Sequence, residues 1–222
     1  LFAFTVGDSW NGQEGFRIAA AHTDFPGLRV KQHAEMIRGN YGQLNVEVYG
    51  GAILNTWLDR PLSAAGRVAL KSDDVFHPQM RLVDLKRPVF IIPNLAIHLN
   101  REVNKGVELN RQKDLLPLAG MGGEQMSDQF FRELLAKELH VEPEEILDYE
   151  IGLYNADQPE YVGIHEEFLS APRIDNLSGV QAILTGITEG SRDGINVAAF
   201  FDHEEVGSRT KQGAGSMFLS MV

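Results

Sequence analysis

The chain has 222 residues, of which 43% are hydrophobic and 23% charged, as is typical of a soluble globular protein with one large domain or two small ones. Its 20 Lys and Arg residues against 31 Asp and Glu residues give a formal net charge of −11, which argues against nucleic acid or an anionic membrane as a partner. Without Cys, disulfides and thiolate metal ligands are excluded. We find neither an apolar segment long enough to span a bilayer nor a signal peptide, and we expect a cytoplasmic protein.

The first elements along the chain are predicted strands. Apolar and alternating residues predict strands over 1–7 and 16–22, joined as a hairpin by a turn-rich loop that contains Asn11 and Gly12. The second strand is apolar almost throughout, which is typical of a strand with both faces covered. Residues 42–49 alternate apolar and polar side chains, which predicts a half-exposed strand. Short β-like runs divided by Pro and Gly then continue to about Tyr154.

Two helices interrupt the strands. Residues 127–140 predict a helix with Ser127 as its N-cap and an apolar face that repeats every four residues: Phe131, Leu135 and Leu139. Residues 176–190 predict a second helix with Gly190 as its C-cap. The run "INVAAFF" that follows is typical of a buried strand in a parallel sheet.

These elements predict an α/β fold in which a central mixed sheet is flanked by helices and interrupted by a β-rich insert. We expect the first part of the α/β domain over residues 1–54, the insert over 55–154 and the second part over 155–222. Both ends of the chain fall inside predicted elements, so we expect a chain that is truncated at both ends.

Three polar clusters each follow an apolar run, and in open α/β sheets ligands bind at the carboxyl ends of the strands. The clusters are His22 with Asp24, Arg173 with Asp175 and Asn176, and Glu204 with Glu205. Imidazole and carboxylate ligands without Cys are typical of a hydrolytic zinc, manganese or cobalt centre rather than a structural zinc site.

The residue types also suggest distinct roles. His22 could ligate a metal through one ring nitrogen while Asp24, two residues on, orients it or a neighbouring ligand. Asp175 could bridge two cations through its two oxygens. Glu204 and Glu205 are adjacent and diverge, so one could ligate while the other takes a proton from water. Cations would remove the repulsion between these two carboxylates.

Each cluster also has a simpler explanation when it is considered alone. His22 could be a half-buried structural histidine, and Asp24 could cap the turn before Pro26. Asp175 could belong to the N-cap of the following helix, and the two glutamates could lie in a solvated loop. Motifs for a nucleophilic serine, a P-loop, a dinucleotide site and HExxH are absent, so the three clusters together favour a metal centre.

Four segments in chain order closely resemble the aspartyl aminopeptidase family of dinuclear zinc metallopeptidases. They are "AAAHTDFPGLRVK", "IPNLAIHLNREVN", "SAPRIDNLSG" and "FFDHEEVGS", and the resemblance covers essentially all 222 residues. It implies an α/β catalytic domain with an inserted β-rich dimerisation domain, and dimers that assemble into a dodecameric tetrahedral shell. It also implies two divalent cations per subunit, zinc in the first place and manganese or cobalt as alternatives.

The resemblance assigns roles to individual residues. His22 matches the first metal-ligating histidine, Asp24 the aspartate that orients the site, and Asp175 the bridging ligand. Glu204 matches the general base and Glu205 a ligand of the second metal.

The same resemblance concerns residues farther from this centre. His98 matches a histidine of the inserted domain that reaches a neighbouring subunit's active site. Two further ligands of the family, an Asp and a His, would follow the segment "GAGSM", and this chain ends at Val222 before either. Phe25 stands where many members have a small polar residue.

We therefore expect a metalloaminopeptidase that removes N-terminal residues, preferably Asp or Glu, from peptides with a free N-terminus. An acidic preference needs a cationic subsite, for which Arg173 and Lys211 are the candidates. Two alternatives stay open: a catalytically incomplete fragment that acts only in assembly, and a related di-zinc deacylase or carboxypeptidase.

Overall fold

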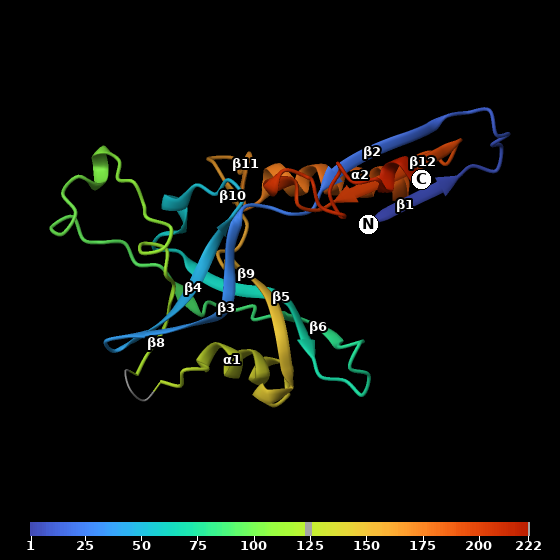
Figure 1. Ribbon diagram of the computed structural model, residues 1–222. Coiled ribbons are helices and arrows are strands. Elements are labelled where there is room, and N and C mark those ends of the chain that lie inside the picture. The colour runs from blue at the N-terminus through green and yellow to red at the C-terminus, as the bar shows by residue number, and fades with distance from the viewer. Residues whose placement is uncertain (123–125, 222) are drawn as a thin grey trace. The chain divides into compact units, whose positions relative to one another are not determined.

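The computed structural model describes residues 1–122 and 126–221, and the chain divides into two compact units (Figure 1). The split unit consists of Leu1–Pro26 and Pro159–Val222, and the insert unit is Gly27–Gln158. The insert unit begins earlier than the predicted boundary at residue 55, because the strands before that boundary pair with strands of the same unit.

The split unit is built on a three-stranded mixed sheet in the order β1–β12–β2 (Figure 1). Its strands are β1 (Phe2–Val6), β2 (Phe16–His22) and β12 (Ile195–Phe201). β12 runs antiparallel to β1 and parallel to β2. The predicted hairpin between the first two strands is therefore wrong: β12, which is buried almost throughout, takes the central place between them.

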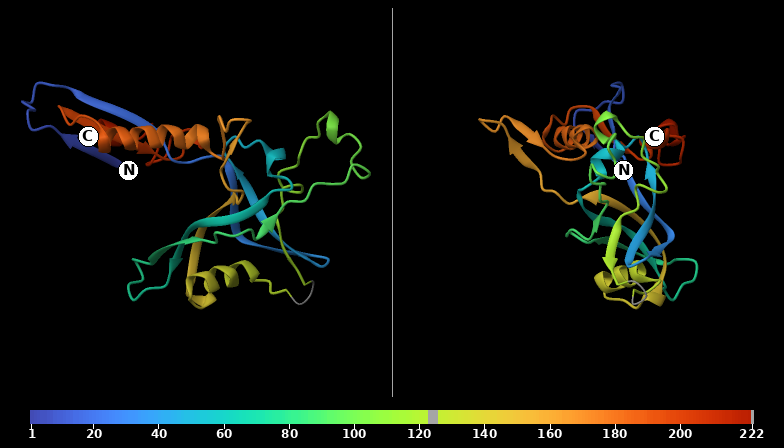
Figure 2. Two further views of the ribbon diagram at one scale, coloured as in Figure 1. Left: turned by 180° about the vertical axis from the view of Figure 1, so that it is seen from behind. Right: turned by 90° about the vertical axis from the view of Figure 1, so that its left-hand side faces the viewer.

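β2 is more exposed than its apolar sequence predicted. Within the described residues it is an edge strand, and Phe16 and Ile18 are 58% and 52% exposed. Helix α2 (Ile174–Glu189) contacts β2 and β12, and the left-hand view of Figure 2 shows it lying along β2. A Cβ at Gly179 would lie 3.7 Å from the Cβ of Ala21, an ordinary van der Waals contact, so this part of α2 packs directly on β2.

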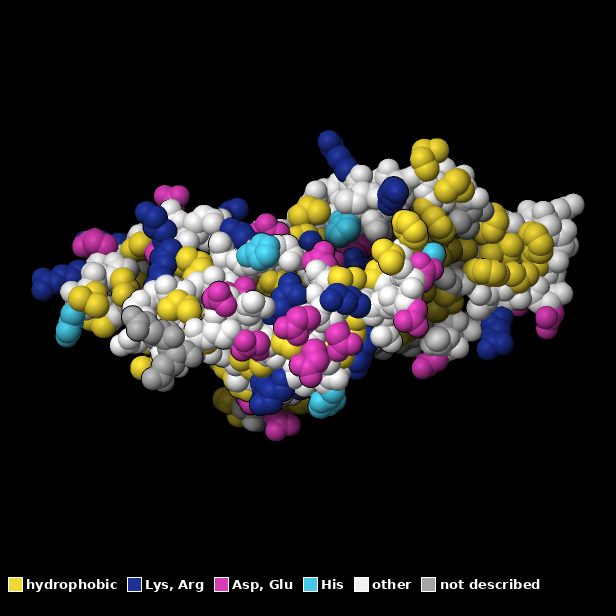
Figure 3. Space-filling model, turned by 60° about the horizontal axis from the view of Figure 1, so that its bottom comes forward, with side chains coloured by type: hydrophobic (Ala, Val, Ile, Leu, Met, Phe, Trp, Pro, Cys, Tyr) yellow, Lys and Arg dark blue, Asp and Glu magenta, His cyan; other side chains and the backbone are white. Residues whose placement is uncertain are grey.

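The remaining elements of the split unit are short. Strands β10 (Glu160–Val162) and β11 (Phe168–Ser170) pair only with each other among the described residues, and both are exposed. α2 ends as predicted at Gly190, whose N–H donates to the carbonyl of Gly186. The 3-10 turn η5 (Glu204–Val206) and helix α3 (Phe218–Met221) follow β12. Figure 3 shows hydrophobic side chains gathered on the surface of this unit, on the right of the view.

The insert unit is a seven-stranded antiparallel sheet in the order β6–β5–β7–β8–β4–β3–β9. Its strands are β3 (Gly27–Arg38), β4 (Tyr41–Tyr49), β5 (Pro61–Leu70), β6 (Gln79–Asp84), β7 (Phe90–Ile91), β8 (Leu118–Met121) and β9 (Ile146–Asn155). β5 also pairs with β9 along most of its length, so the sheet closes on itself. Short 3-10 turns lie at Leu54–Trp57, Val103–Lys105 and Pro143–Glu145.

Helix α1 (Phe130–Leu139) covers part of the core of this unit. Its predicted apolar face is confirmed, since Phe131, Leu135 and Leu139 are all buried. The predicted N-cap is wrong by two residues: Gln129 is the cap, while the Ser127 hydroxyl accepts the N–H of Gln129 and donates to a carboxylate of the first turn.

Among residues 1–122 and 126–221, no helix combines the length and apolar character that crossing a membrane requires.

Candidate metal centre

Parallel pairing of β2 and β12 brings two of the three predicted clusters together. Phe201, the last residue of β12, pairs with His22, the last residue of β2. Thr23 extends the contact, because its N–H and its hydroxyl both donate to the carbonyl of Phe201, at 2.9 and 3.1 Å. The carboxyl ends of the two strands therefore lie side by side, where ligands bind in sheets of this kind.

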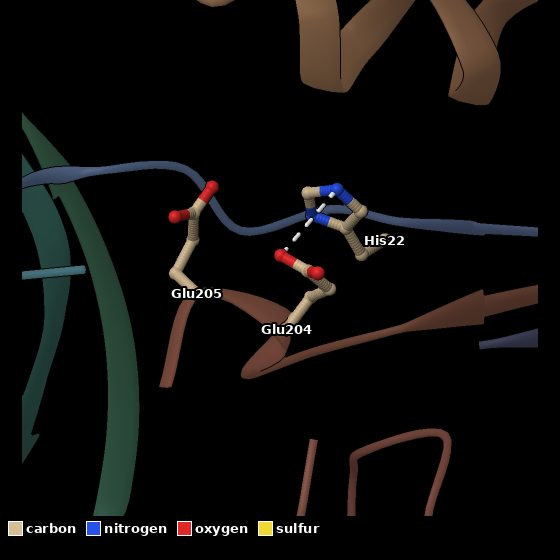
Figure 4. A group of neighbouring side chains, drawn as sticks. All are labelled: His22, Glu204 and Glu205. Atoms are coloured by element: carbon tan, nitrogen blue, oxygen red, sulfur yellow. Dashed lines mark ion pairs between the residues drawn. The ribbon is translucent and has the colours of Figure 1, made fainter. Parts of the chain in front are cut away.

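Three side chains at this edge form a group that could hold a metal ion. His22, Glu204 and Glu205 each offer one ligand atom, and these atoms lie within 4.8 Å of one another. Figure 4 shows the Glu204 carboxylate turned toward the imidazole of His22, and Oε2 of Glu204 lies 3.9 Å from Nε2 of His22. Glu205 follows on the same segment (Figure 4). The predicted proximity of these residues is present in the structure.

Asp24 contacts all three residues of this group. Its side chain is only 7% exposed, and its Oδ1 and Oδ2 accept the N–H groups of Glu204 and Glu205, both at 3.1 Å. Nδ1 of His22 lies 3.3 Å from Oδ1 of Asp24 and 3.1 Å from its main-chain carbonyl. A donor at Nδ1 leaves the lone pair of the imidazole on Nε2, the nitrogen that faces Glu204.

The turn after β12 has a conformation that few residues adopt. His203 has a φ of 61° and Gly207 a φ of 98°, so left-handed residues stand on both sides of η5. Nδ1 of His203 lies 2.7 Å from the hydroxyl of Thr210, so the His203 imidazole has a hydrogen-bond partner within the turn. A left-handed residue other than glycine costs of the order of 1–3 kcal/mol and persists where the surroundings enforce it. Here the two N–H bonds to Asp24 contribute to that enforcement.

The two glutamates are held differently. Glu205 is half-buried, and its Oε1 accepts a hydrogen bond from Nδ2 of Asn176 at 3.1 Å. The side chain of Glu204 is 54% exposed and lies next to the imidazole of His22. A carboxylate fixed by a donor suits a metal ligand, whereas an exposed one has the freedom that proton transfer requires.

Asp175 lies in the first turn of α2 and not at the end of a sheet strand. The preceding apolar run forms β11 in the exposed β10–β11 hairpin, so the expected third strand end is not part of the β1–β12–β2 sheet. Oδ1 of Asp175 accepts the N–H of Asn176 at 3.1 Å. Asp175 is not among the three residues of the group, but its neighbour Asn176 contacts Glu205.

The other predicted residues lie outside the group of three. Arg173 precedes α2 with a φ of 65°, and its guanidinium carbon lies 4.8 Å from the centre of the Phe25 ring, a cation–π contact. Lys211 is exposed in the loop after η5. His98 is exposed in the insert unit.

The donor chemistry fits a catalytic zinc ion. One imidazole nitrogen and two carboxylates, with an aspartate beside the imidazole and an amide beside one carboxylate, are ligands and supports of the kind that such sites use. Asn176 belongs to one of the three predicted clusters, but its residue type and position predicted no role for it. The signal was its place beside Asp175, but the contact with Glu205 needed the fold.

Comparison with known proteins gives a consistent result over the whole chain. The family model described as "Aminopeptidase I zinc metalloprotease (M18)" matches residues 1–222. The "Probable M18 family aminopeptidase 2" of Clostridium novyi is 46% identical over 225 residues, which cover 100% of this chain and 52% of that protein. The protein of the same description from Clostridium acetobutylicum is 44% identical with the same coverage. The chain thus spans about half the length of these relatives.

Solved structures agree with the sequence relatives. Ape4, in a cryo-EM structure of its complex with Nbr1, superposes with a TM-score of 0.90 at 37% identity, over 99% of this chain and 46% of that one. Chaetomium thermophilum mApe1 gives a TM-score of 0.88 at 31% identity, over 99% and 53%. The Saccharomyces mApe1 dodecamer gives 0.76 at 26% identity, over 99% and 51%. The predicted α/β fold class is confirmed, and the chain belongs to the M18 family of aminopeptidase I zinc metalloproteases.

Proposed function

We propose that the protein is a metal-dependent aminopeptidase that removes N-terminal residues from peptides. The observation that carries this proposal is the convergence of His22, Glu204 and Glu205 at the paired ends of β2 and β12, in a chain of the M18 family. The relatives carry the description of aminopeptidases, and the family model that of zinc metalloproteases.

We propose two divalent cations per subunit, zinc in the first place. His22 and Glu205 would hold one each, and Asp175 would bridge the two, with Asp24 orienting the imidazole of His22. The cations would supply a Lewis acid for the substrate carbonyl and would lower the pKa of a water molecule. The contacts of Glu205 and Asp24 support this division of roles.

Glu204 is the proposed general base. Its carboxylate is exposed and lies beside His22, a proposed metal ligand, which supports a role in taking a proton from the attacking water. It takes that proton and later gives it to the amine that leaves when the peptide bond breaks. Its main-chain N–H donates to Asp24, so its backbone is fixed while its side chain remains free to move.

An acidic first residue is the proposed preference, and it needs a local cation because the chain as a whole carries a net charge of −11. Arg173 and Lys211 are the proposed cationic residues of this subsite. The cation–π contact with the Phe25 ring supports Arg173, because it holds the guanidinium at a defined place near the N-terminus of α2.

The proposed assembly is a homo-oligomer in which the insert unit forms the dimer contacts. The dodecamer described for Saccharomyces mApe1 supports a higher assembly of dimers. His98 is proposed to reach the active site of a neighbouring subunit. We propose a cytoplasmic location, which a sequence without Cys suits.

Hydrolysis of a peptide with a free N-terminal Asp tests the function directly. We expect release of free Asp in the presence of zinc, loss of the reaction with a chelator, and no cleavage of the N-acetylated peptide. Equal cleavage of the acetylated peptide would favour the deacylase alternative. A protein that binds no zinc and cleaves neither peptide would favour a role in assembly alone. Replacing Asp by Leu at the first position measures the acidic preference separately.

A further inference from the structure

Asn176 is the residue through which two proposed metal ligands are linked. Its main-chain N–H donates to Oδ1 of Asp175 at 3.1 Å, and its side-chain Nδ2 donates to Oε1 of Glu205 at 3.1 Å. Asp175 and Glu205 come from different elements, the start of α2 and the turn after β12. One residue therefore contacts two carboxylates that the sequence places 30 positions apart.

The burial of Asn176 is unusual for its place in the fold. It is 6% exposed and is the buried residue of α2, whereas Asp175 before it and Leu177 after it are exposed. Within the described part of the chain, its Oδ1 has no hydrogen-bond partner. Burying an amide with one unpaired oxygen lowers stability, so packing alone is a poor explanation for an asparagine here.

The chemistry of the contact fixes the orientation of the amide. An ionised carboxylate only accepts hydrogen bonds, so the NH₂ group of Asn176 has to face Glu205, and a flipped amide would place two oxygens against each other. An apolar residue of similar size could not make this contact. A hydrogen bond to a charged group is stronger than one between neutral groups, which makes it suited to holding a side chain in one rotamer.

We propose that Asn176 is a positioning residue that holds Glu205 in the orientation in which it ligates a metal, and that its main chain ties this orientation to Asp175. The inference rests on the proposed function, since it takes Glu205 as a ligand. Glu205 is then fixed at both ends, by Asp24 at its N–H and by Asn176 at its carboxylate. Residues that support metal ligands in this way are worth about 10–100-fold in metal affinity or activity.

Two variants of the whole protein test the proposal: Asn176→Ala, which removes the donor, and Asn176→Leu, which keeps the size of the side chain. Gln181→Ala is the matched control, because Gln181 lies on the same helix and its amide donates to the exposed Thr185 hydroxyl instead. The zinc dissociation constant is measured by competition with a chromophoric chelator. Urea unfolding of the metal-free proteins is measured in parallel, so that loss of fold and loss of affinity are separated.

We expect both Asn176 variants to bind zinc about 10–100-fold more weakly than the wild type, with the control unchanged. Zinc affinities equal to the wild type in folded Asn176 variants would overturn the inference and leave the proposed function standing. A loss of metal-free stability without a change in zinc affinity would give Asn176 a structural role only, and would overturn it as well. A wild-type protein that binds no zinc would refute the proposed function itself, together with the inference.

Discussion

Replacing Asp24 by Asn tests whether one carboxylate organises the candidate centre. In the wild type, one oxygen accepts the N–H of Glu204 and the other the N–H of Glu205. The Asn side chain keeps one oxygen and turns an NH₂ group toward the other N–H, so one partly buried donor loses its acceptor and faces a second donor. Hydrogen bonds to charged groups contribute about 1.5–3 kcal/mol, and we expect the free energy of unfolding of the split unit to fall by about this amount.

The same change should weaken zinc binding about 10–100-fold, because His22 and both glutamates take their positions from Asp24. Urea unfolding of the metal-free protein and chelator competition measure the two effects. Asp202→Asn is the control, since Asp202 is a half-exposed carboxylate of the same turn that accepts the N–H of the adjacent His203. If Asp24→Asn matches the wild type in both assays, the assignment of Asp24 as the organising residue is refuted.

Three further changes give distinct results. Glu204→Gln should lower kcat by about 10²–10⁴-fold while zinc affinity stays at the wild-type value, and a parallel loss of zinc would make Glu204 a ligand instead of the base. Leu135→Ala, at a side chain that is 0% exposed, should lower the free energy of unfolding of the insert unit by about 2–5 kcal/mol in urea; no change would show that α1 does not pack on the core as described. Burial, and then the charge of Glu35, raise the pKa of Tyr149 from 10.0 to about 12. The free energy of unfolding should therefore fall as the pH rises from 10.0 to about 12, and it should fall less in Tyr149→Phe. Parallel curves of unfolding free energy against pH for the two proteins would contradict this cause.

The sequence predicted the candidate metal centre because the apolar runs that form its strands are local signals and the pairing of these strands places their ends together. The buried run of β12 and the apolar run of β2 indicated a parallel sheet, and parallel strands bring His22 and Glu204 to one edge whatever the length of chain between them. Helix α1 was predicted, over residues 127–140, for a similar reason, because its apolar period of four residues is a local signal.

The sequence failed where a distant segment decided the outcome. Asn11 and Gly12 are a strong local turn signal, but they cannot show that β12, from the far end of the chain, lies between the two strands they join. Likewise, the apolar run 168–170 did not reveal that its partner is the short β10 strand. The contact of Asn176 with Glu205 could not be predicted either, because it forms only where the start of α2 lies beside the η5 turn.

The pairing of β3 with β9 has a consequence for folding. β3 opens the insert unit and β9 closes it, and Leu28 pairs with Leu153. Once the insert unit is folded, its two ends are held together. The entropy lost on closing the connection between the two parts of the split unit is then that of a short loop and not that of a long flexible segment. Joining β2 to β12 then costs much less conformational entropy than the separation of His22 and Phe201 along the chain suggests. We therefore expect the insert unit to fold first and the paired ends of β2 and β12 to form after it.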